Sequence, residues 1–245
     1  MLKSAMKSDI GRVRTVNEDR IVIRENPEGC SFAIVADGMG GHQAGDTASQ
    51  MTIELVQDSL QRLSSAWTEE ERAAYLSESI RQANAKVFEL ASGKEHYRGM
   101  GTTLTVALVD REQLLIGHIG DSRAYLLHDD VCSQLTEDHT LVSELVKTGQ
   151  ILPEEASSHP RRNVLTRALG TDAEVEVDIT RRTWRNGDML LLCSDGLSNM
   201  VPPDEMLRLA RSDDSLDAVV DKLVSYALEA GGDDNISVAL LRYDD

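Results

Sequence analysis

The sequence has few of the features that mark secreted, zinc-binding or membrane-spanning proteins. Its three cysteines, Cys30, Cys132 and Cys193, stand far apart, without the paired spacing of a zinc site or a disulfide framework. No apolar run approaches the ~20 residues of a membrane span, and Met1 leads into no signal-like apolar stretch. Unpaired cysteines suit a reducing compartment, so we expect a cytoplasmic protein with no membrane partner.

Basic residues are scarce as well. The 25 lysines and arginines are outnumbered by 42 acidic residues, which leaves a formal net charge of −17. This balance argues against nucleic acid or an anionic membrane as the main partner. An anionic substrate would be repelled at long range, so individual arginines or bound cations would have to attract it locally.

Aromatic residues make up only 4% of the chain, whereas 41% of its residues are hydrophobic. The core must therefore be built from leucine, isoleucine, valine, alanine and methionine. The length of 245 residues exceeds the usual domain size, but layered folds of this size are often single domains. The sequence contains no low-complexity linker and no repeat of fixed period, so we expect one domain.

The stretch from Phe32 to Gly45 reads FAIVADGMGGHQAG and sets a carboxylate at the end of a rigid element. The apolar residues 32–36, bounded by turn formers, predict a buried strand because they are too few for a helix. Asp37 closes this strand, and the glycines after it let the backbone approach a ligand closely. The carbonyl oxygen of Gly38 then becomes a possible ligand atom.

Four further acids stand at the ends or starts of predicted strands. Asp121 and Asp195 each close an apolar run, whereas Asp19 and Asp234 precede one. In an antiparallel pair the start of one strand lies beside the end of its neighbour, so acids in these positions can meet at one edge. A hairpin connection at 26–29 would bring Asp19 next to Asp37.

Such a convergence of carboxylates needs a cation. Like charges a few ångströms apart raise each other's pKa and oppose ionisation, and a bound cation removes that penalty. A ligand set made only of oxygen atoms suits Mg²⁺ or Mn²⁺. No stretch matches the calcium-loop pattern, and no His-x-x-x-His pair supports zinc.

Apolar periodicity and turn residues predict the other elements. A helical stripe runs from Ala48 to Leu63, and a capping box at Thr68 opens a second helix that ends near Gly93. The chain from Glu137 to Gly170 is irregular and polar, and we interpret His139, His159, Arg161 and Arg162 there as parts of a solvated loop. The remaining expected elements are strands at 4–9, 102–109, 114–119, 124–127, 175–179, 189–193 and 236–243, and helices at 141–147, after 153 and at 216–228.

Six short motifs follow one another along the chain: RTVNED at 14–19, DGMGGH at 37–42, MGTT at 100–103, GDSR at 120–123, SDG at 194–196 and GDDN at 232–235. In this order and spacing they resemble the motifs of the metal-dependent protein phosphatase (PPM, type 2C) family, in particular its compact bacterial serine/threonine phosphatases. The resemblance extends from about Lys7 to Leu241. It implies an α+β fold, a four-layer αββα sandwich of two mainly antiparallel sheets with helices on both outer sides. One domain would span residues 1–245, with a flap-like irregular insertion at about 137–170.

The resemblance also implies an activity and its partners. Members of this family hydrolyse phosphoserine and phosphothreonine in proteins without a covalent phosphoenzyme, using Mn²⁺ or Mg²⁺ as two core ions and a third, weaker one. For this chain we therefore expect phosphorylated proteins as substrates, a cognate bacterial serine/threonine kinase whose action it reverses, and a monomeric state. The spacing of the residues does not itself exclude phosphotyrosine.

The family pattern assigns roles residue by residue. Asp37 would bridge the two core ions, with the Gly38 carbonyl on one of them. The other ligands would be Asp195 and Asp234 on the second core ion, Asp19 and Glu18 acting through metal-bound water, and Asp121 with Asp195 on the third ion.

Two further residues would act on the substrate. Arg14 would hold the phosphate with its planar, permanently charged guanidinium group. His42, with an ordinary pKa near ~6.5, could protonate the departing alkoxide. It follows Asp37 by five residues, whereas eukaryotic members carry a histidine at the position of Met39.

Two other classes of function stay open from the residues alone. A pseudophosphatase would keep the fold and bind phosphoproteins without turnover. Such proteins usually lack a metal-binding aspartate, whereas this sequence retains all of the expected ones. A nucleotide-binding enzyme is the other alternative, because glycines follow the strand at 32–36. The loop lacks both the G-x-G-x-x-G pattern and a Gly-Lys-Ser/Thr motif, which disfavours that alternative.

Overall fold

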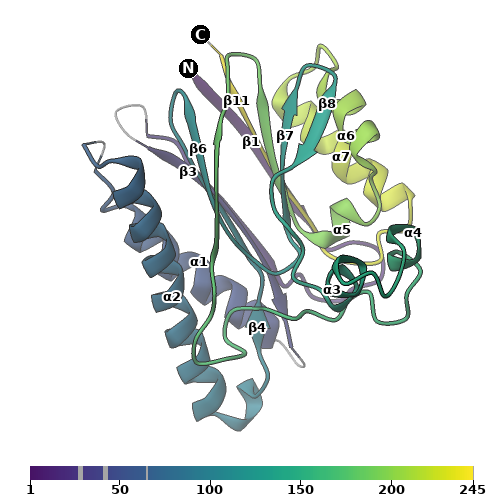
Figure 1. Cartoon of the computed structure of the whole chain (residues 1–245). Coiled ribbons are helices and arrows are strands. Elements are labelled where there is room, and N and C mark those ends of the chain that lie inside the picture. Colours follow the sequence, from purple (N-terminus) through teal and green to yellow (C-terminus); the bar gives the residue numbers. More distant parts are fainter. Residues whose placement is uncertain (27–29, 41–43, 65, 245) are drawn as a thin grey trace.

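Two antiparallel β-sheets packed face to face form the centre of the computed structural model, which describes residues 1–26, 30–40, 44–64 and 66–244 (Figure 1). The first sheet has the strand order β1-β11-β10-β7-β8, and the second has the order β2-β3-β5-β6-β9, with the short β4 beside β3. The strands are β1 Leu2–Asp9, β2 Asp19–Arg24, β3 Ser31–Met39, β4 Gly101–Thr102, β5 Leu104–Val109, β6 Gln113–Ile119, β7 Arg123–His128, β8 Val131–Gln134, β9 Asp178–Thr183, β10 Met189–Cys193 and β11 Ile236–Tyr243.

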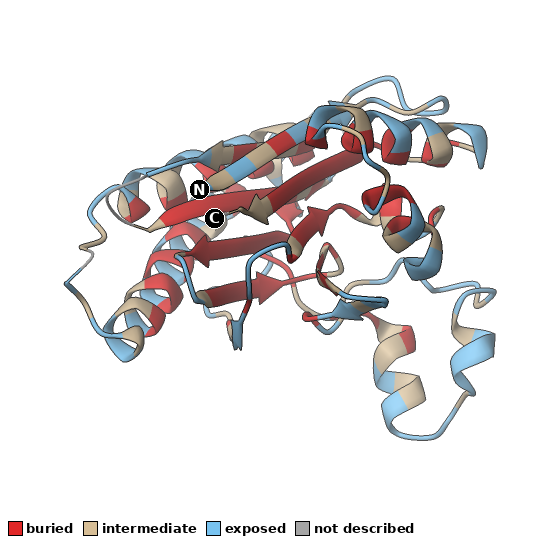
Figure 2. Cartoon of the chain, turned by 90° about the horizontal axis from the view of Figure 1, so that it is seen from above, coloured by how far each residue is buried: buried red, intermediate tan, exposed pale blue. Residues whose placement is uncertain are grey.

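Helices cover the outer face of each sheet, and the buried strands lie between them (Figure 2). Helices α1 and α2 pack on the second sheet, whereas α5, α6 and α7 pack on the first. The helices are α1 Ala44–Leu60, α2 Glu69–Gly93, the 3₁₀ turn η1 Glu95–Tyr97, α3 Leu141–Lys147, α4 Pro153–Ala156, α5 Asp195–Ser198, α6 Pro203–Ala210 and α7 Leu216–Glu229. This arrangement confirms the expected fold class.

Strand β3 explains why its sequence is a continuous apolar run. Successive side chains of a strand point to opposite faces, and both faces of β3 are covered. Ala33 and Val35 lie in the core between the sheets, whereas Phe32, Ile34 and Ala36 lie in the core under α1 and α2. The central strand is therefore fixed from both sides up to the point where the chain reaches Asp37.

The core between the sheets is aliphatic, as the low aromatic content predicts. Trp184 is its one tryptophan among the described residues, and its indole nitrogen donates a hydrogen bond to the Asp110 carbonyl oxygen at 2.8 Å. The capping box at α2 is also confirmed. The Glu71 backbone nitrogen donates to the Thr68 hydroxyl, and the Thr68 backbone nitrogen donates to the Glu71 carboxylate.

One predicted strand is misplaced. The alternation of Val175 and Val177 predicts a strand at 175–179, but β9 spans Asp178–Thr183. Both valines pack against the core under α1 and α2 from irregular chain, so their spacing reflects burial without strand pairing. Helix α6, which begins just after Pro202, has no counterpart among the sequence predictions.

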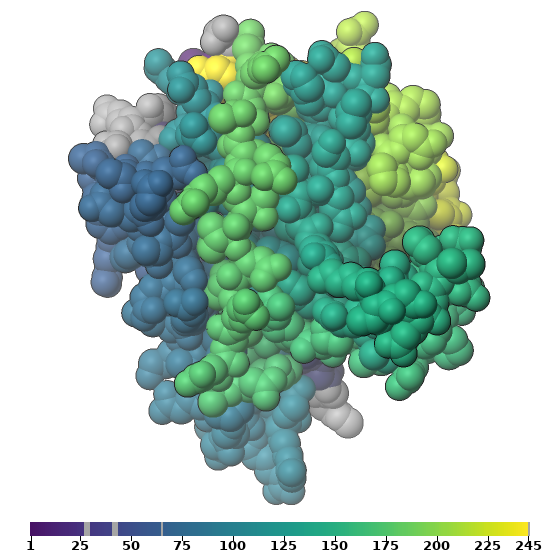
Figure 3. Space-filling view, viewed as in Figure 1, coloured from purple at the N-terminus to yellow at the C-terminus, as the bar shows by residue number. Residues whose placement is uncertain are grey.

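The segment 137–170 is irregular apart from α3 and α4, as expected, and it projects from one side of the molecule (Figure 3). An antiparallel bridge between Thr140 and Leu165 closes its base. Its description as a flap, and the extent of the domain at 1–245, stay predictions. Within the described ranges, no helix combines the length and the hydropathy needed to cross a bilayer.

Candidate active site

The β2–β3 pair brings the first two acids together. Asp19 opens β2 and lies directly opposite Asp37 near the end of β3, as the proposed hairpin requires. Part of its connection, residues 27–29, lies outside the described residues. The Asp37 backbone nitrogen donates to the Thr103 hydroxyl at 3.0 Å, which anchors the end of β3 to the neighbouring chain.

Asp195 follows β10 of the other sheet and opens α5, and a hydrogen bond joins the two sheets at this point. The Ser194 hydroxyl donates to the Asp19 carboxylate oxygen Oδ2 at 2.6 Å. Asp234 precedes β11, which is the neighbour of β10, and Asp121 follows β6 in the second sheet. Five predicted acids from both sheets therefore lie around one edge of the sandwich.

The pKa values of Asp19, Asp37, Asp121 and Asp195 record the mutual proximity of the acids. Burial, followed by the charges of Asp19, Asp195, Asp121 and Asp234, raises the pKa of Asp37 well above its ordinary value. Burial is also the largest cause for Asp19, whose pKa rises to about 7, for Asp195, about 6, and for Asp121, about 8. The group is a set of desolvated, like-charged neighbours, which is the condition that a cation relieves.

Two carboxylate oxygens point to where a cation would be held. Within the described residues, the Oδ1 atoms of Asp19 and Asp195 are buried and have no hydrogen-bond partner. Unpaired buried oxygens are costly, so this donor set fits a hard divalent ion. The carboxylates are neighbours and not a closed shell, because no three His, Cys, Asp or Glu side chains of the described residues already stand in coordinating positions.

Arg14 lies beside this group on the loop between β1 and β2. Its Nη2 atom is 2.6 Å from the Asp234 Oδ2 atom, and half of the Arg14 side chain is exposed. Glu18 precedes Asp19, and burial raises the pKa of its carboxyl, while the charge of Arg14 and then the Gly45 backbone N–H act in the opposite direction. Gly38 follows Asp37 within β3, and its backbone nitrogen donates to the Glu18 carbonyl oxygen at 3.2 Å. His42 lies outside the described residues.

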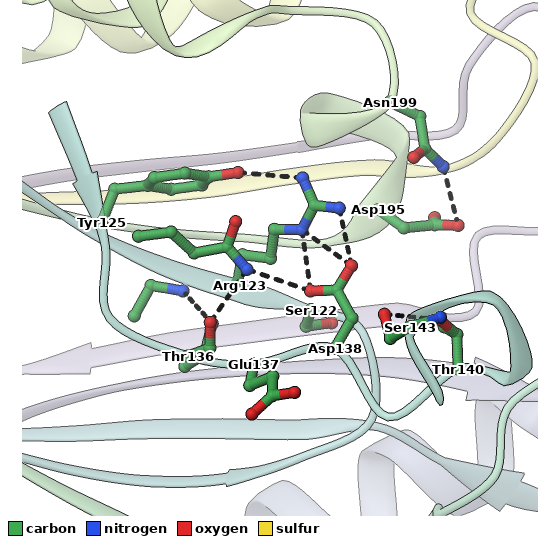
Figure 4. Close-up of polar contacts among 12 residues, drawn as sticks. Ser122, Arg123, Tyr125, Thr136, Glu137, Asp138, Thr140, Ser143, Asp195 and Asn199 are labelled. Carbon is green, nitrogen blue, oxygen red and sulfur yellow. Dashed lines mark hydrogen bonds and ion pairs between the residues drawn. The ribbon is translucent and has the colours of Figure 1, made fainter. Parts of the chain in front are cut away.

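The structure adds polar residues that the sequence predictions omit (Figure 4). The Asn199 side-chain nitrogen donates to Asp195 Oδ2 at 3.1 Å, one helical turn after it. Arg123 forms a bidentate ion pair with Asp138, in which Nε donates to Oδ1 at 2.9 Å and Nη2 donates to Oδ2 at 2.6 Å. The four-residue spacing could have identified Asn199, but no sequence signal pairs Arg123 with Asp138.

The base of the segment 137–170 is more ordered than the sequence suggests. His139 is buried, in contrast to the predicted solvated loop. Its Nδ1 atom accepts a hydrogen bond from the Gly120 backbone nitrogen at 3.0 Å, and its Nε2 atom lies 3.1 Å from Asp178 Oδ2. Since Nδ1 accepts, Nε2 carries the proton and donates it to the carboxylate. Arg161 and Arg162 are exposed, as predicted.

A groove of about 680 Å³ connects the acids to this segment. Its lining includes Asp121, Asp195 and Asp234 of the acidic group and Ser157 and Arg162 of the segment 137–170. The groove is open and polar, which suits an extended peptide better than a small apolar ligand.

A family model described as protein phosphatase 2C matches residues 11–240. The chain belongs to this family. It is accordingly a serine/threonine protein phosphatase, and the sequence resemblance is confirmed.

Curated relatives and solved structures of this phosphatase family match almost the whole chain. The serine/threonine phosphatase Stp of Listeria innocua is 44% identical, with 98% of this chain and 95% of the relative covered. The structure of the Streptococcus agalactiae serine/threonine phosphatase superposes with a TM-score of 0.94 at 36% identity, covering 100% of both chains. The catalytic domain of the phosphatase PstP, solved in complex with two manganese ions, matches with a TM-score of 0.86 at 36% identity, over 100% of this chain and 99% of that one.

The raised carboxyl pKa values predict an unusual dependence of stability on pH in chelator-treated phosphatase. A carboxyl whose pKa is higher in the folded than in the unfolded state binds more protons when folded, so lowering the pH stabilises the fold. With Asp19 at about 7 and Asp121 at about 8, the free energy of unfolding should rise as the pH falls from 9 to 7. Urea unfolding at several pH values measures this slope.

The variant Asp121→Asn should flatten the slope, whereas Asp58→Asn, on the exposed face of α1, serves as the control and should leave it unchanged. The interval from pH 9 to pH 7 lies above the pH at which His118 affects the stability. Burial lowers the pKa of His118 to about 4, so its contribution changes only below about pH 6.5. A slope that Asp121→Asn does not alter would contradict the assignment.

Proposed function

We propose that the phosphatase hydrolyses phosphoserine and phosphothreonine in proteins by the attack of an activated water on phosphorus, without a covalent intermediate. The observation that carries this proposal is the group of buried and half-buried carboxylates beside the groove, which come from both sheets. When bound, two divalent ions, Mn²⁺ or Mg²⁺, would lower the pKa of water and polarise the phosphoryl oxygens.

The ligands for the core ions would be Asp37, the Gly38 carbonyl, Asp195 and Asp234. Asp37 follows the core of a strand of one sheet and Asp195 follows a strand of the other, so residues from both sheets would hold the ions, with Asp37 as the proposed shared ligand. Asp19 would act indirectly, through water and not as a direct ligand, and the hydrogen bond from the Ser194 hydroxyl would orient its carboxylate. Glu18 and Asp121 complete the proposed set, with Asp121 beside Asp195 as a site for a third, weaker ion.

The alternative of a cysteine nucleophile is disfavoured by the three thiols. Burial raises the pKa of Cys193 to about 12 and those of Cys30 and Cys132 to about 11. A thiol with such a pKa has almost no thiolate at neutral pH and is a poor nucleophile. This supports water as the attacking group.

Arg14 would bind the substrate phosphate. Its guanidinium group has several N–H donors, so the contact with Asp234 leaves others free for phosphate oxygens. His42 would act as the general acid that protonates the leaving serine or threonine oxygen. With a net charge of −17, the phosphatase would rely on such local contacts to attract an anionic substrate.

In the cell, phosphorylated proteins would enter the groove, and the activity would reverse a cognate bacterial serine/threonine kinase. We place this work in the cytoplasm and assign it to a monomer. The single domain would span 1–245, with the segment 137–170 as a flap over the groove.

The first prediction of this proposed function is metal-dependent release of inorganic phosphate from a phosphothreonine peptide. Turnover should appear with Mn²⁺, vanish with chelator, and fall by roughly 10²-fold or more in Asp195→Asn, because a neutral amide is a weaker ligand for a hard cation. Asp58→Asn, an exposed aspartate on α1, is the matched control and should keep full activity. Metal binding without any turnover by the native chain would favour a phosphoprotein-binding pseudophosphatase instead.

The second prediction concerns Arg14. Losing a charged hydrogen bond to phosphate should raise KM for the phosphopeptide roughly tenfold or more in Arg14→Ala. kcat should change less, since the arginine would hold the phosphate in both ground and transition states. Arg24→Ala, exposed at the far end of β2, is the control. An unchanged KM in Arg14→Ala would make the arginine an ordinary surface cation.

The third prediction concerns His42. A general acid matters most when the leaving group is a poor one, so His42→Ala should slow a phosphothreonine peptide by roughly 10²-fold and an activated aryl phosphate far less. Steady-state rates on both substrates measure the difference, with His96→Ala, exposed in η1, as control. Equal losses on the two substrates would remove the general-acid role.

A further inference from the structure

The loop that carries Arg14 is fastened to a distant part of the chain by one buried amide. Residues 10–18 connect β1 to β2, and the Asn235 side chain reaches this loop from the start of β11. Its nitrogen Nδ2 donates to the Ile10 carbonyl oxygen at 2.9 Å and to the Val16 carbonyl oxygen at 3.0 Å. Its oxygen Oδ1 accepts from the Glu18 backbone nitrogen at 2.8 Å.

These three bonds hold both ends of the loop. Ile10 precedes Arg14 by four residues, and Val16 follows it by two. Arg14 therefore lies in a short arch, residues 10–16, whose two ends are fixed by these bonds. The arch is too short to move far without breaking a bond at one end. Asn235 is itself 4% exposed, so water does not readily replace its bonds.

Two backbone contacts bring the loop and the turn at 231–235 close enough for the amide to reach. The Arg12 backbone nitrogen donates to the Gly232 carbonyl oxygen at 2.8 Å. Gly11 has φ +80, and a Cβ there would lie 2.2 Å from the Asp234 carbonyl oxygen. Only glycine permits this approach at that position.

The chemistry at this position calls for asparagine. The loop offers two carbonyl oxygens, which need donors, and one N–H, which needs an acceptor, and a primary amide supplies this combination. An aspartate would face two carbonyl oxygens with a charged oxygen of its own. A serine is too short to bridge them and has only one donor.

We infer that Asn235 is a positioning residue for phosphate binding, which fixes Arg14 beside Asp234 by holding the loop 10–18. This inference rests on the proposed role of Arg14. Since Asp234 and Asn235 are consecutive, one turn of the chain would supply both a proposed metal ligand and the anchor of the phosphate-binding arginine. The 2.6 Å contact between Arg14 and Asp234 shows how closely the two are set.

The test compares Asn235→Ala with a matched variant, Asn84→Ala. Asn84 is 1% exposed, and its amide also makes three bonds to one loop, donating to the carbonyl oxygens of Asp172 at 3.0 Å and Ala173 at 3.3 Å and accepting from the Gly170 nitrogen at 2.8 Å. Both variants should lower the thermal unfolding midpoint. Only Asn235→Ala should raise KM for the phosphopeptide. We expect a rise of roughly threefold to tenfold, because a misplaced Arg14 would lose binding free energy equal to one or two net hydrogen bonds.

A second readout follows the loop itself. Trypsin cleaves after arginine, and the arch contains Arg12 and Arg14, so release of the loop should open these sites in folded Asn235→Ala and not in Asn84→Ala. Mass spectrometry of the first fragments identifies the cut. Asn235→Ser, which leaves a smaller cavity, replaces Asn235→Ala should the latter not fold, and the same results are expected.

A double variant separates the inference from the role of Arg14. In the Arg14→Ala background, Asn235→Ala should raise KM little further, because the group that it positions is gone. If Arg14→Ala raises KM and Asn235→Ala does not, the inference is wrong while the proposed role of Arg14 stands. If the two effects multiply in full, Asn235 acts independently of Arg14, which also overturns the inference. If Arg14→Ala leaves KM unchanged, both fall together.

Discussion

The electrostatic repulsion among desolvated carboxylates at one edge of the sandwich is the constraint on which the site depends. Asp37 alone has four acidic neighbours that raise its pKa, in addition to the effect of burial. Such a group would separate if its members were mobile. It persists because each acid lies in or within two residues of a strand, so that moving it would disturb a buried sheet.

The core stabilises this edge through strands whose two faces are both buried. β3 delivers Asp37 with one face in the core between the sheets and the other under α1 and α2, and β10 delivers Asp195 in the same way from the first sheet. The bond from Ser194 to Asp19 then joins the sheets at the site itself. Asp19, Asp37 and Asp195 are therefore set apart by rigid elements, as a preorganised centre requires, while Asp121 and Asp234 lie in short connections next to strands.

Where sequence patterns follow local geometry, they predicted this architecture well. The apolar run before Asp37 and the capping box at Thr68 each depend on residues within one element, and both are found as expected. The strand at 175–179 failed because alternating valines can bury themselves without a partner strand. The prediction that His139 lies in a solvated loop was wrong for a related reason, since its partners Gly120 and Asp178 lie 19 and 39 residues away in the sequence.

Charged and uncharged members of the site differ in how far they can be recognised. Acids at the ends of strands can be recognised in the sequence as candidate ligands, because carboxylates that converge need a bound cation, and this requirement holds without knowledge of the structure. Asn235 carries no such requirement: an amide before a strand is equally suited to a turn, a cap or solvent. Its three bonds reach Glu18, Val16 and Ile10, 217 to 225 residues away, and only the packing of β1 and β11 as neighbours brings them within reach. The proposed ligands can thus be inferred from the chemistry of the sequence, whereas the proposed positioning residue Asn235 becomes evident only once the fold is known.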